Sequence, residues 1–207
     1  MKIKVCGLTD EKQIEKLINL KIDFLGFIFY PQSPRYVLDK LSVDKIAEFF
    51  HVGKVGVFVN EKIEKIVKTV KKADLNYIQL HGNEDSEFRN ELRRYIDPKV
   101  KLIKVMRMRT DNFNDKNIEE SLVCTDYLLF DTDSQYYGGT GKTFDWKLLD
   151  KVSLSLPYFL SGGISLENID QIKNIKQRPF ALDVNSKFEI SAGVKDLDKI
   201  TLLKKEA

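Results

Sequence analysis

A regular alternation of two kinds of segment constrains this chain more than any other feature. Eight short apolar runs follow one another at intervals of roughly 21 to 31 residues, and a segment that we expect to be helical follows each of them. Such runs are typical of parallel strands buried on both faces, with helices as the crossover connections. The expected strands are 2–6, 23–29, 54–59, 76–81, 100–106, 127–131, 157–160 and 180–184.

The first of the expected helices shows its periodicity most clearly. Thr9 or Asp10 is placed to cap it. Its apolar residues recur at the 3-4 spacing of one helical face, namely Ile14, Leu17, Ile18 and Ile22. Two prolines exclude a helix from 30–36, which we expect to be a long loop. Further helices are expected within 43–50, 61–73, 84–95, 114–122, 145–150, 166–175 and 197–204.

These units predict an α/β fold, a single-domain (β/α)8 TIM barrel that spans residues 1–207. An open, doubly wound sheet also alternates strands and helices. It rarely contains eight short units in so compact a chain, and no break in composition separates the units. The barrel is therefore the favoured architecture.

Composition limits the partners of such a barrel. A net charge of +3 with lysines scattered among acidic residues indicates a mixed-charge surface, and not a nucleic-acid or membrane footprint. The longest apolar run, 24–30, is too short to span a bilayer, and no secretory signal precedes the first strand. Two cysteines do not suggest a disulfide framework, so we expect a cytoplasmic protein.

The active site of a barrel of this class lies at the carboxyl ends of its strands. Cys6, His81, Asp131 and Asp183 each end a strand, at positions whose side chains alternate toward the barrel interior. A thiolate base and a carboxylic acid that is partly removed from water, in Cys6 and Asp131, suit the movement of protons on one substrate. Arg35, in the loop that contains the prolines, could form a forked pair with a carboxylate.

Two further segments at the predicted mouth suit a phosphate group. The seventh and eighth loops of such barrels commonly hold phosphate through backbone N–H groups and a helix amino terminus. Here they contain Ser161-Gly162-Gly163 and Asp183-Val184-Asn185-Ser186. The glycine-rich stretch 138–143 does not match a Walker motif, because Tyr136 stands where that motif has its first glycine.

Other interpretations of the cysteines are weaker. We expect Cys124, just before the sixth strand, to be a small buried apolar residue. Cys6 and Cys124 are expected at opposite ends of their strands, too far apart for a disulfide. No third soft or imidazole ligand accompanies Cys6 and His81 at a strand end, so no metal site is predicted.

The motifs, in their order, resemble the phosphoribosylanthranilate isomerase family of tryptophan biosynthesis over nearly the whole length. The matching segments are Lys4-Val5-Cys6-Gly7-Leu8-Thr9, 26–36, 55–60, Gln79-Leu80-His81-Gly82, 129–132 with 138–146, and Leu160-Ser161-Gly162-Gly163-Ile164. The resemblance implies an Amadori rearrangement of N-(5-phosphoribosyl)anthranilate to an aminoketose, without cofactor or metal. The implied partner is this phosphosugar-anthranilate substrate alone, and the enzyme would be a monomer or homodimer.

The resemblance also implies roles for individual residues. Asp131 would protonate the ribose ring oxygen, and Cys6 would take the C2′ proton as a thiolate. Arg35 would meet the anthranilate carboxylate, with His81 and Asp183 as further substrate-binding residues, Asp183 near the sugar hydroxyls. The phosphate would lie on four residues, Gly162, Gly163, Asn185 and Ser186. Lys4, two residues before Cys6 on the same face, is a candidate for lowering the pKa of the thiol.

The last motif departs from the family pattern. The family usually has two serines and a glycine where this chain has Asn185-Ser186-Lys187, and a proline-glycine pair where it has Ala192-Gly193. A lysine at position 187 would be strained if that position required a positive φ. The phosphate subsite is therefore the part of the implied site that departs from the family pattern.

Two alternatives remain open at this point. A related sugar-phosphate isomerase or epimerase would need the phosphate loops, but not Cys6, Asp131 and Arg35 together. A barrel that only binds a phosphorylated metabolite would fit the altered eighth loop, but would not need an acid-base pair.

Overall fold

The fold is a closed barrel of eight parallel strands. The structure is a computed structural model that describes residues 1–108, 115–132 and 145–206. The strands pair in chain order, and β1 closes the barrel on β8. They are β1 (Lys2–Val5), β2 (Phe24–Ile28), β3 (Lys54–Phe58), β4 (Tyr77–Leu80), β5 (Lys101–Met108), β6 (Tyr127–Thr132), β7 (Tyr158–Leu160) and β8 (Ala181–Val184). The predicted (β/α)8 barrel is confirmed.

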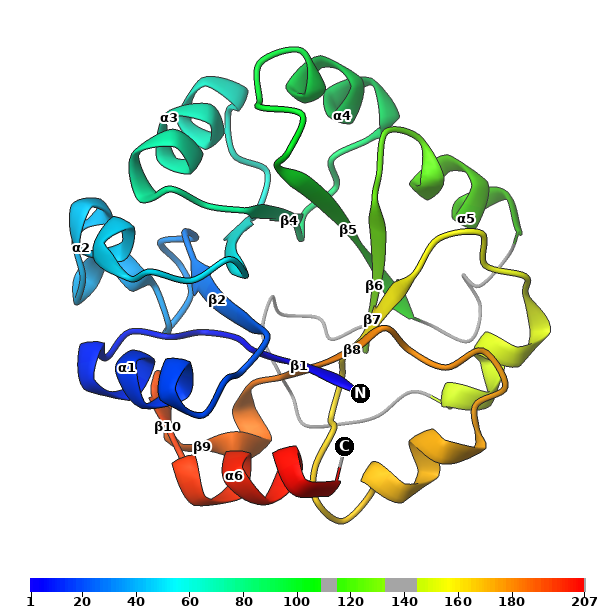
Figure 1. Cartoon of the computed structure of the whole chain (residues 1–207). Coiled ribbons are helices and arrows are strands. Elements are labelled where there is room, and N and C mark those ends of the chain that lie inside the picture. The colour runs from blue at the N-terminus through cyan, green and yellow to red at the C-terminus, as the bar shows by residue number, and fades with distance from the viewer. Residues whose placement is uncertain (109–114, 133–144, 207) are drawn as a thin grey trace.

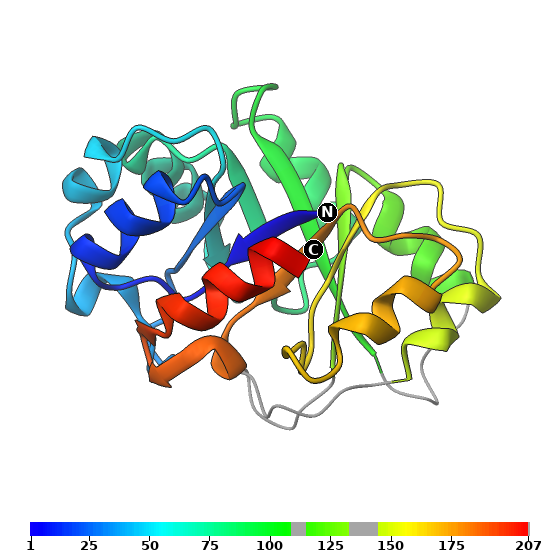
Figure 2. The ribbon, with the colours of Figure 1, turned by 60° about the horizontal axis from the view of Figure 1, so that its bottom comes forward.

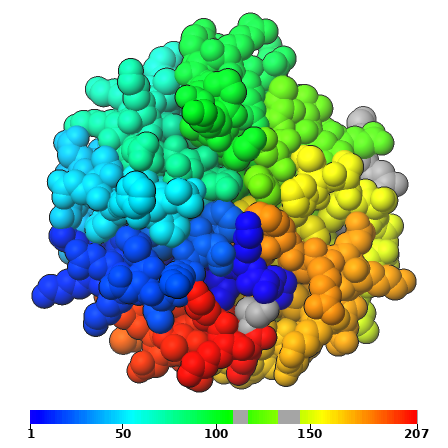
Figure 3. Space-filling model, viewed as in Figure 1, coloured from blue at the N-terminus to red at the C-terminus, as the bar shows by residue number. Residues whose placement is uncertain are grey.

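The helices surround the strands, as Figure 1 shows from one end of the barrel. The α-helices are α1 (Glu11–Asn19), α2 (Val43–Glu48), α3 (Ile63–Ala73), α4 (Ser86–Arg93), α5 (Asp115–Leu122) and α6 (Leu197–Glu206). The 3-10 helices are η1 (Val37–Asp39), η2 (Trp146–Lys151), η3 (Ile169–Asn174) and η4 (Ser186–Phe188). The space-filling view shows the segments following one another around this face, with the first and last side by side (Figure 3).

Local sequence explains the start of α1. Asp10 is its N-cap, and the Asp10 carboxylate accepts a hydrogen bond of 2.8 Å from the backbone N–H of Gln13. Thr9, the other candidate cap, instead donates to the backbone carbonyl of Gly193. Ile14 and Leu17 are fully buried, as their spacing predicts. This cap fixes where α1 begins, directly after the loop that follows Cys6.

Two elements differ from the expected helices. The segments predicted within 145–150 and 166–175 form the 3-10 helices η2 and η3. Each contains six residues, and a 3-10 helix closes its first hydrogen bond over fewer residues than an α-helix does. A two-stranded hairpin of β9 (Glu189–Ser191) and β10 (Val194–Lys195) was not expected, because strands of three and two residues show no periodicity.

The core has two layers. The larger lies between the strands and the helices, and the smaller fills the inside of the barrel. The inner layer contains Phe24, Val55, Ile103, Val105, Leu129, Phe159 and Ala181, with Tyr77, Tyr127 and Phe180 packed against it. Its rings meet edge to face, as Phe24 and Phe159 do at 5.2 Å between centroids. Since aromatic rings fill the amino-terminal part of the interior, polar side chains gather at the other end.

Figure 2 turns the barrel and shows α6 lying across it beside α1. The Lys204 ammonium, near the end of α6, donates to the backbone carbonyls of Leu20 and Lys21, just after α1. The last helix is thereby fixed to the first. Within the described residues, the helices are all too short or too polar to cross a membrane. The glycine-rich stretch 138–143 lies outside the described residues.

Candidate active site

A cavity opens at the carboxyl ends of the strands, where the sequence analysis placed the chemistry. All nine selected residues lie on its wall, namely Cys6, Arg35, His81, Asp131, Gly162, Gly163, Asp183, Asn185 and Ser186. The cavity is also lined by residues to which the analysis gave no role, among them Tyr30, Ser33, Val57 and Gln79. Closure of the barrel thus brings together side chains from the first to the last strand.

Cys6 lies at the end of β1 beside a buried ion pair. The Nζ atom of Lys4 is 2.8 Å from Oδ1 of Asp183 on β8, and both side chains are almost fully buried. Burial raises the pKa of the Cys6 thiol. The positive charge of Lys4 acts to lower this pKa, and the negative charge of Asp183 acts to raise it. The expected effect of Lys4 is therefore present but smaller than that of burial.

Gly26 on β2 makes the space that Cys6 occupies. A Cβ atom at position 26 would lie 2.9 Å from both the Cα and the Sγ of Cys6. Backbone cannot move aside as a flexible side chain can, so β2 requires glycine at this level.

Asp131 is the second-last residue of β6, and two neighbouring residues contact its carboxylate. Its Oδ1 accepts a 2.9 Å hydrogen bond from the backbone N–H of Thr132, and its Oδ2 lies 3.5 Å from Nε2 of His81. The Asp131 side chain is 24% exposed, so it can reach a molecule in the cavity. Nδ1 of His81 is 3.1 Å from the amide nitrogen of Gln79, which leaves Nε2 as the N–H that faces Asp131 when the ring is neutral.

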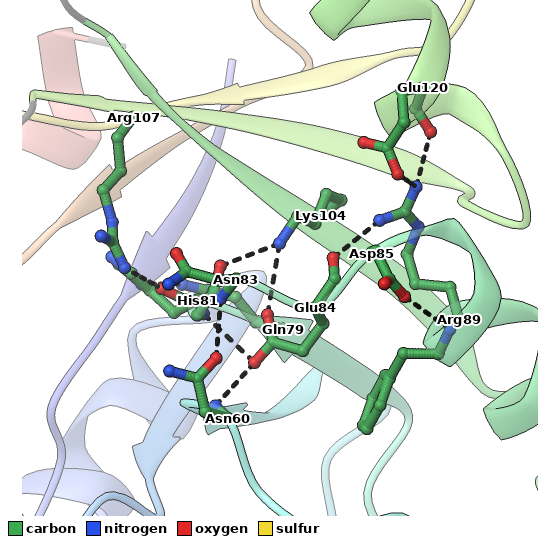
Figure 4. A network of polar contacts seen from close by, with 12 residues as sticks. Asn60, Gln79, His81, Asn83, Glu84, Asp85, Arg89, Lys104, Arg107 and Glu120 are labelled. Atoms are coloured by element: carbon green, nitrogen blue, oxygen red, sulfur yellow. Dashed lines mark hydrogen bonds and ion pairs between the residues drawn. The ribbon is translucent and has the colours of Figure 1, made fainter.

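The backbone around His81 is held by a network of buried charges, which Figure 4 shows. Arg107 donates to the carbonyl of His81 at 2.7 Å, and Lys104 donates to the carbonyl of Gly82 at 2.9 Å. Glu84 accepts from the backbone N–H groups of Asn60 and Gly82 and pairs with Lys104 at 3.2 Å. The loop that carries His81 is therefore tied to β3 and β5.

Arg35 meets a carboxylate of the protein itself. Its Nε lies 2.9 Å from Oε1 of Glu189, and its Nη2 lies 2.6 Å from Oε2. Glu189 thus occupies one fork of the guanidinium. Among the described residues it is the acceptor that this side chain reaches, and the fork that contains Nη1 remains for another carboxylate.

The seventh loop has a left-handed backbone at both of its glycines. Gly162 and Gly163 have φ of +85° and +72°. A Cβ on Gly162 would also lie 2.3 Å from Oγ1 of Thr132. Asn185, the N-cap of η4, and Ser186, its first residue, line the same cavity after the neighbouring strand β8. Lys187 lies in this 3-10 helix without a positive φ, so its replacement of glycine brings no backbone strain.

Cys124 is not buried as expected. It is partly exposed and adopts a left-handed backbone with φ of +55° where the chain turns into β6. Both cysteines are free. Within residues 1–108, 115–132 and 145–206, three or more His, Cys, Asp or Glu side chains do not gather in a way that could hold a metal ion.

Comparison with known proteins decides the family. Residues 3–206 match the family model of N-(5'phosphoribosyl)anthranilate (PRA) isomerase. The chain belongs to this family. It is 41% identical to N-(5'-phosphoribosyl)anthranilate isomerase of Parabacteroides distasonis, over 97% of this chain and 90% of that protein.

Solved structures of PRA isomerases agree with this assignment. The enzyme of Thermotoga maritima is 33% identical, with a TM-score of 0.83 over 100% of this chain and 98% of that one. Another crystal structure of the Thermotoga enzyme describes it as dimeric. A PRA isomerase in complex with reduced 1-(o-carboxyphenylamino)-1-deoxyribulose 5-phosphate is 30% identical, with a TM-score of 0.78 over 99% of this chain and 97% of that one.

Two residues near the PRA isomerase site were missed by the sequence analysis. Glu189 binds Arg35, and Lys195 on β10 binds Glu189 and Asn185. The sequence signals were the two charges in the segment that follows the last strand and, for Glu189, a glutamate at the same place in the eighth-loop motif of the family. Their partners lie in the second loop, which is distant in sequence.

Proposed function

We propose that this chain catalyses the Amadori rearrangement of N-(5'-phosphoribosyl)anthranilate in tryptophan biosynthesis, with Asp131 as general acid and Cys6 as general base. The observation that carries the proposal is that a carboxyl group on β6 and a thiol after β1 face one cavity from different sides of the barrel. The membership of the family supports the same reaction.

The first step opens the sugar ring. Asp131 donates its proton to the ribose ring oxygen as the C1′–O bond breaks, and the anthranilate nitrogen supplies the electron pair that forms the C1′=N bond of the Schiff base. The N–H of His81 faces the other carboxylate oxygen and stabilises the aspartate that results.

The second step moves a proton from carbon. Cys6, as thiolate, removes the proton from C2′, and the electron pair of that bond forms an enolamine, which tautomerises to the ketone. C2′ is oxidised and C1′ is reduced within one molecule, so the reaction balances without an external electron carrier. Because burial raises the pKa of Cys6, the charge of Lys4 is needed to make the thiolate accessible.

Binding of the substrate uses the two charged ends of the molecule. Its carboxylate meets the remaining fork of Arg35, and its phosphate meets Gly162, Gly163, Asn185 and Ser186. Asp183 lies between these ends and accepts hydrogen bonds from the sugar hydroxyls. We further propose a cytoplasmic enzyme that acts as a monomer or homodimer, in keeping with two free cysteines and with the dimeric Thermotoga enzyme.

The test is the loss of phosphoribosylanthranilate fluorescence on addition of purified protein. We expect turnover by the wild type, and a fall in kcat of about 10² to 10⁴ in Cys6→Ala and in Asp131→Asn. Cys124→Ala and Asp170→Asn, which change residues outside the cavity, serve as matched controls and should retain activity. An inert wild type that still binds the reduced product analogue would refute the proposed activity and favour a binding protein.

A further inference from the structure

The guanidinium of Arg35 belongs to a cluster of three buried charges. Glu189 lies between Arg35 and Lys195, with its Oε1 2.6 Å from Nζ of Lys195 and its Oε2 2.6 Å from Nη2 of Arg35. The side chains of Arg35, Glu189 and Lys195 are only 10%, 4% and 0% exposed. Charges this far from water interact strongly, so their sum decides which ion can enter.

The cluster carries a net charge of +1 when Lys195 is protonated, because it then contains two cations and one anion. Burial lowers the pKa of Lys195, and the charge of Glu189 acts to raise it. Burial acts to raise the pKa of Glu189, but the hydrogen bond from Arg35 and the charge of Lys195 outweigh it and the pKa is lowered, so Glu189 stays ionised at neutral pH. Without Lys195, Arg35 and Glu189 would form a neutral pair. The carboxylate of a ligand would then have to bind Arg35 while the charge of Glu189 already cancels that of the guanidinium.

The fold holds Lys195 firmly in this position. The side-chain amide of Gln13 on α1 accepts from the backbone N–H of Lys195 at 2.8 Å and donates to its carbonyl at 3.0 Å. The Lys195 ammonium also donates to Oδ1 of Asn185 at 2.8 Å. The cluster also lies close to Gly7, the residue that follows Cys6. A Cβ atom at position 7 would lie 2.6 Å from Cδ of Arg35 and 3.0 Å from Oδ1 of Asn185.

We propose that Lys195 is a positioning residue of the carboxylate subsite, which it keeps cationic by balancing Glu189, so that Arg35 binds the substrate carboxylate while Glu189 still holds the guanidinium in place. Lys195 acts through its neighbours and does not contact the substrate carboxylate. The inference rests on the proposed function, because the anion concerned is the carboxylate of the anthranilate ring.

The experiment measures the affinity of the reduced product analogue, which carries this carboxylate, by calorimetry. Lys195→Met makes the cluster neutral and should weaken binding about tenfold. Lys195→Arg keeps the charge and should bind within about threefold of the wild type. Lys199→Met, which removes an exposed lysine of α6, is the matched control and should leave affinity unchanged.

A double variant separates charge balance from a structural role. Glu189→Gln with Lys195→Met restores a net charge of +1 and should recover most of the lost affinity, whereas a structural role predicts binding weaker than that of either single variant. Glu189→Gln alone raises the charge to +2. Because the amide oxygen of glutamine can still accept a hydrogen bond from Arg35, this variant should bind the analogue more tightly than the wild type.

Three results would overturn the proposal. They are unchanged affinity in Lys195→Met, no recovery in the double variant, and weaker binding in Glu189→Gln alone. If Lys195→Met does not fold, the single Glu189→Gln variant decides. Binding of the analogue does not require turnover, so failure of the inference is distinct from failure of the proposed activity, which the fluorescence assay of the wild type reports.

Discussion

The ammonium of Lys4 on β1 lies 2.8 Å from the carboxylate of Asp183 on β8, at the seam where the last strand closes on the first. These residues are also register partners in the sheet, so barrel closure and ion pairing occur at the same place. Asp183 raises the pKa of Lys4 against the opposing effect of burial, which keeps the ammonium charged beside Cys6. The position of β8 therefore influences the pKa of the Cys6 thiol, which follows β1.

Lys4→Met should shift the pH dependence of catalysis. Removal of the positive charge raises the pKa of the Cys6 thiol further, so the limb of kcat/KM that reports the base moves to higher pH. At a fixed pH below that pKa, each unit of upward shift lowers the rate about tenfold. A pH–rate profile of Lys4→Met with the same limb as the wild type would exclude a role for Lys4. In Lys4→Met the buried Asp183 carboxylate loses its ion-pair partner. The double variant Lys4→Met with Asp183→Asn removes that unpaired charge and serves as the control.

Gly26→Ala should lower kcat by displacing Cys6. The added methyl group would overlap the Cα and Sγ of Cys6 at 2.9 Å, so the thiol moves relative to C2′. Misplacement of a catalytic group by about 1 Å costs about 10²-fold. Gly56→Ala is the matched control, because its methyl group meets the ends of the Leu75 and Phe58 side chains and not Cys6. Equal kcat values for the two alanine variants, measured by the fluorescence assay, would contradict this explanation.

Lys104→Met should destabilise the protein strongly. It leaves the Glu84 carboxylate buried without its ion-pair partner, which costs about 3–5 kcal/mol of unfolding free energy. The double variant with Glu84→Gln should lose less than the sum of the two single variants. Urea unfolding measures all three. Lys72→Met is the control, because it breaks an ion pair with Asp44 between exposed side chains and should change the unfolding free energy by less than about 1 kcal/mol. A similar loss of unfolding free energy in Lys104→Met and Lys72→Met would disprove the role of burial.

Asp126→Asn should destabilise the protein at neutral pH but not in acid. Burial acts to raise the pKa of Asp126, but the hydrogen bonds from Leu102 N–H and Arg93 lower it below its usual value. The stabilisation is present above the pKa of the unfolded chain and is lost as the pH falls through the lower pKa of the folded protein. We expect a deficit of about 1–3 kcal/mol at pH 7.

The measurement for Asp126→Asn is urea unfolding of variant and wild type at several pH values. The difference between them should shrink as the pH falls below about 4. Asp170→Asn, at a carboxylate that is 85% exposed, should match the wild type throughout. A difference between Asp126→Asn and the wild type that does not depend on pH would mean that the charge of Asp126 is not its source.

Much of the barrel could be predicted because its signals are local. A strand buried on both faces is a short apolar run, and the alternation of side chains then assigns Cys6 and Asp183 to the interior at the strand ends. Helix caps such as Asp10 depend on a few neighbouring residues. Neither the hairpin of β9 and β10 nor the 3-10 form of η2 and η3 has a comparable local signal, because those segments are too short.

The sequence by itself determined the barrel, the strand ends and the set of residues at the mouth. Only the tertiary structure decided their partners: Glu189 takes one fork of Arg35, 154 positions away in the chain, and Lys195 balances its charge. The physical reason is that a strand's extent and the alternation of its side chains follow from adjacent residues, whereas an ion pair depends on which loops meet once the barrel closes. The strength of that ion pair depends in turn on how much water the packing excludes.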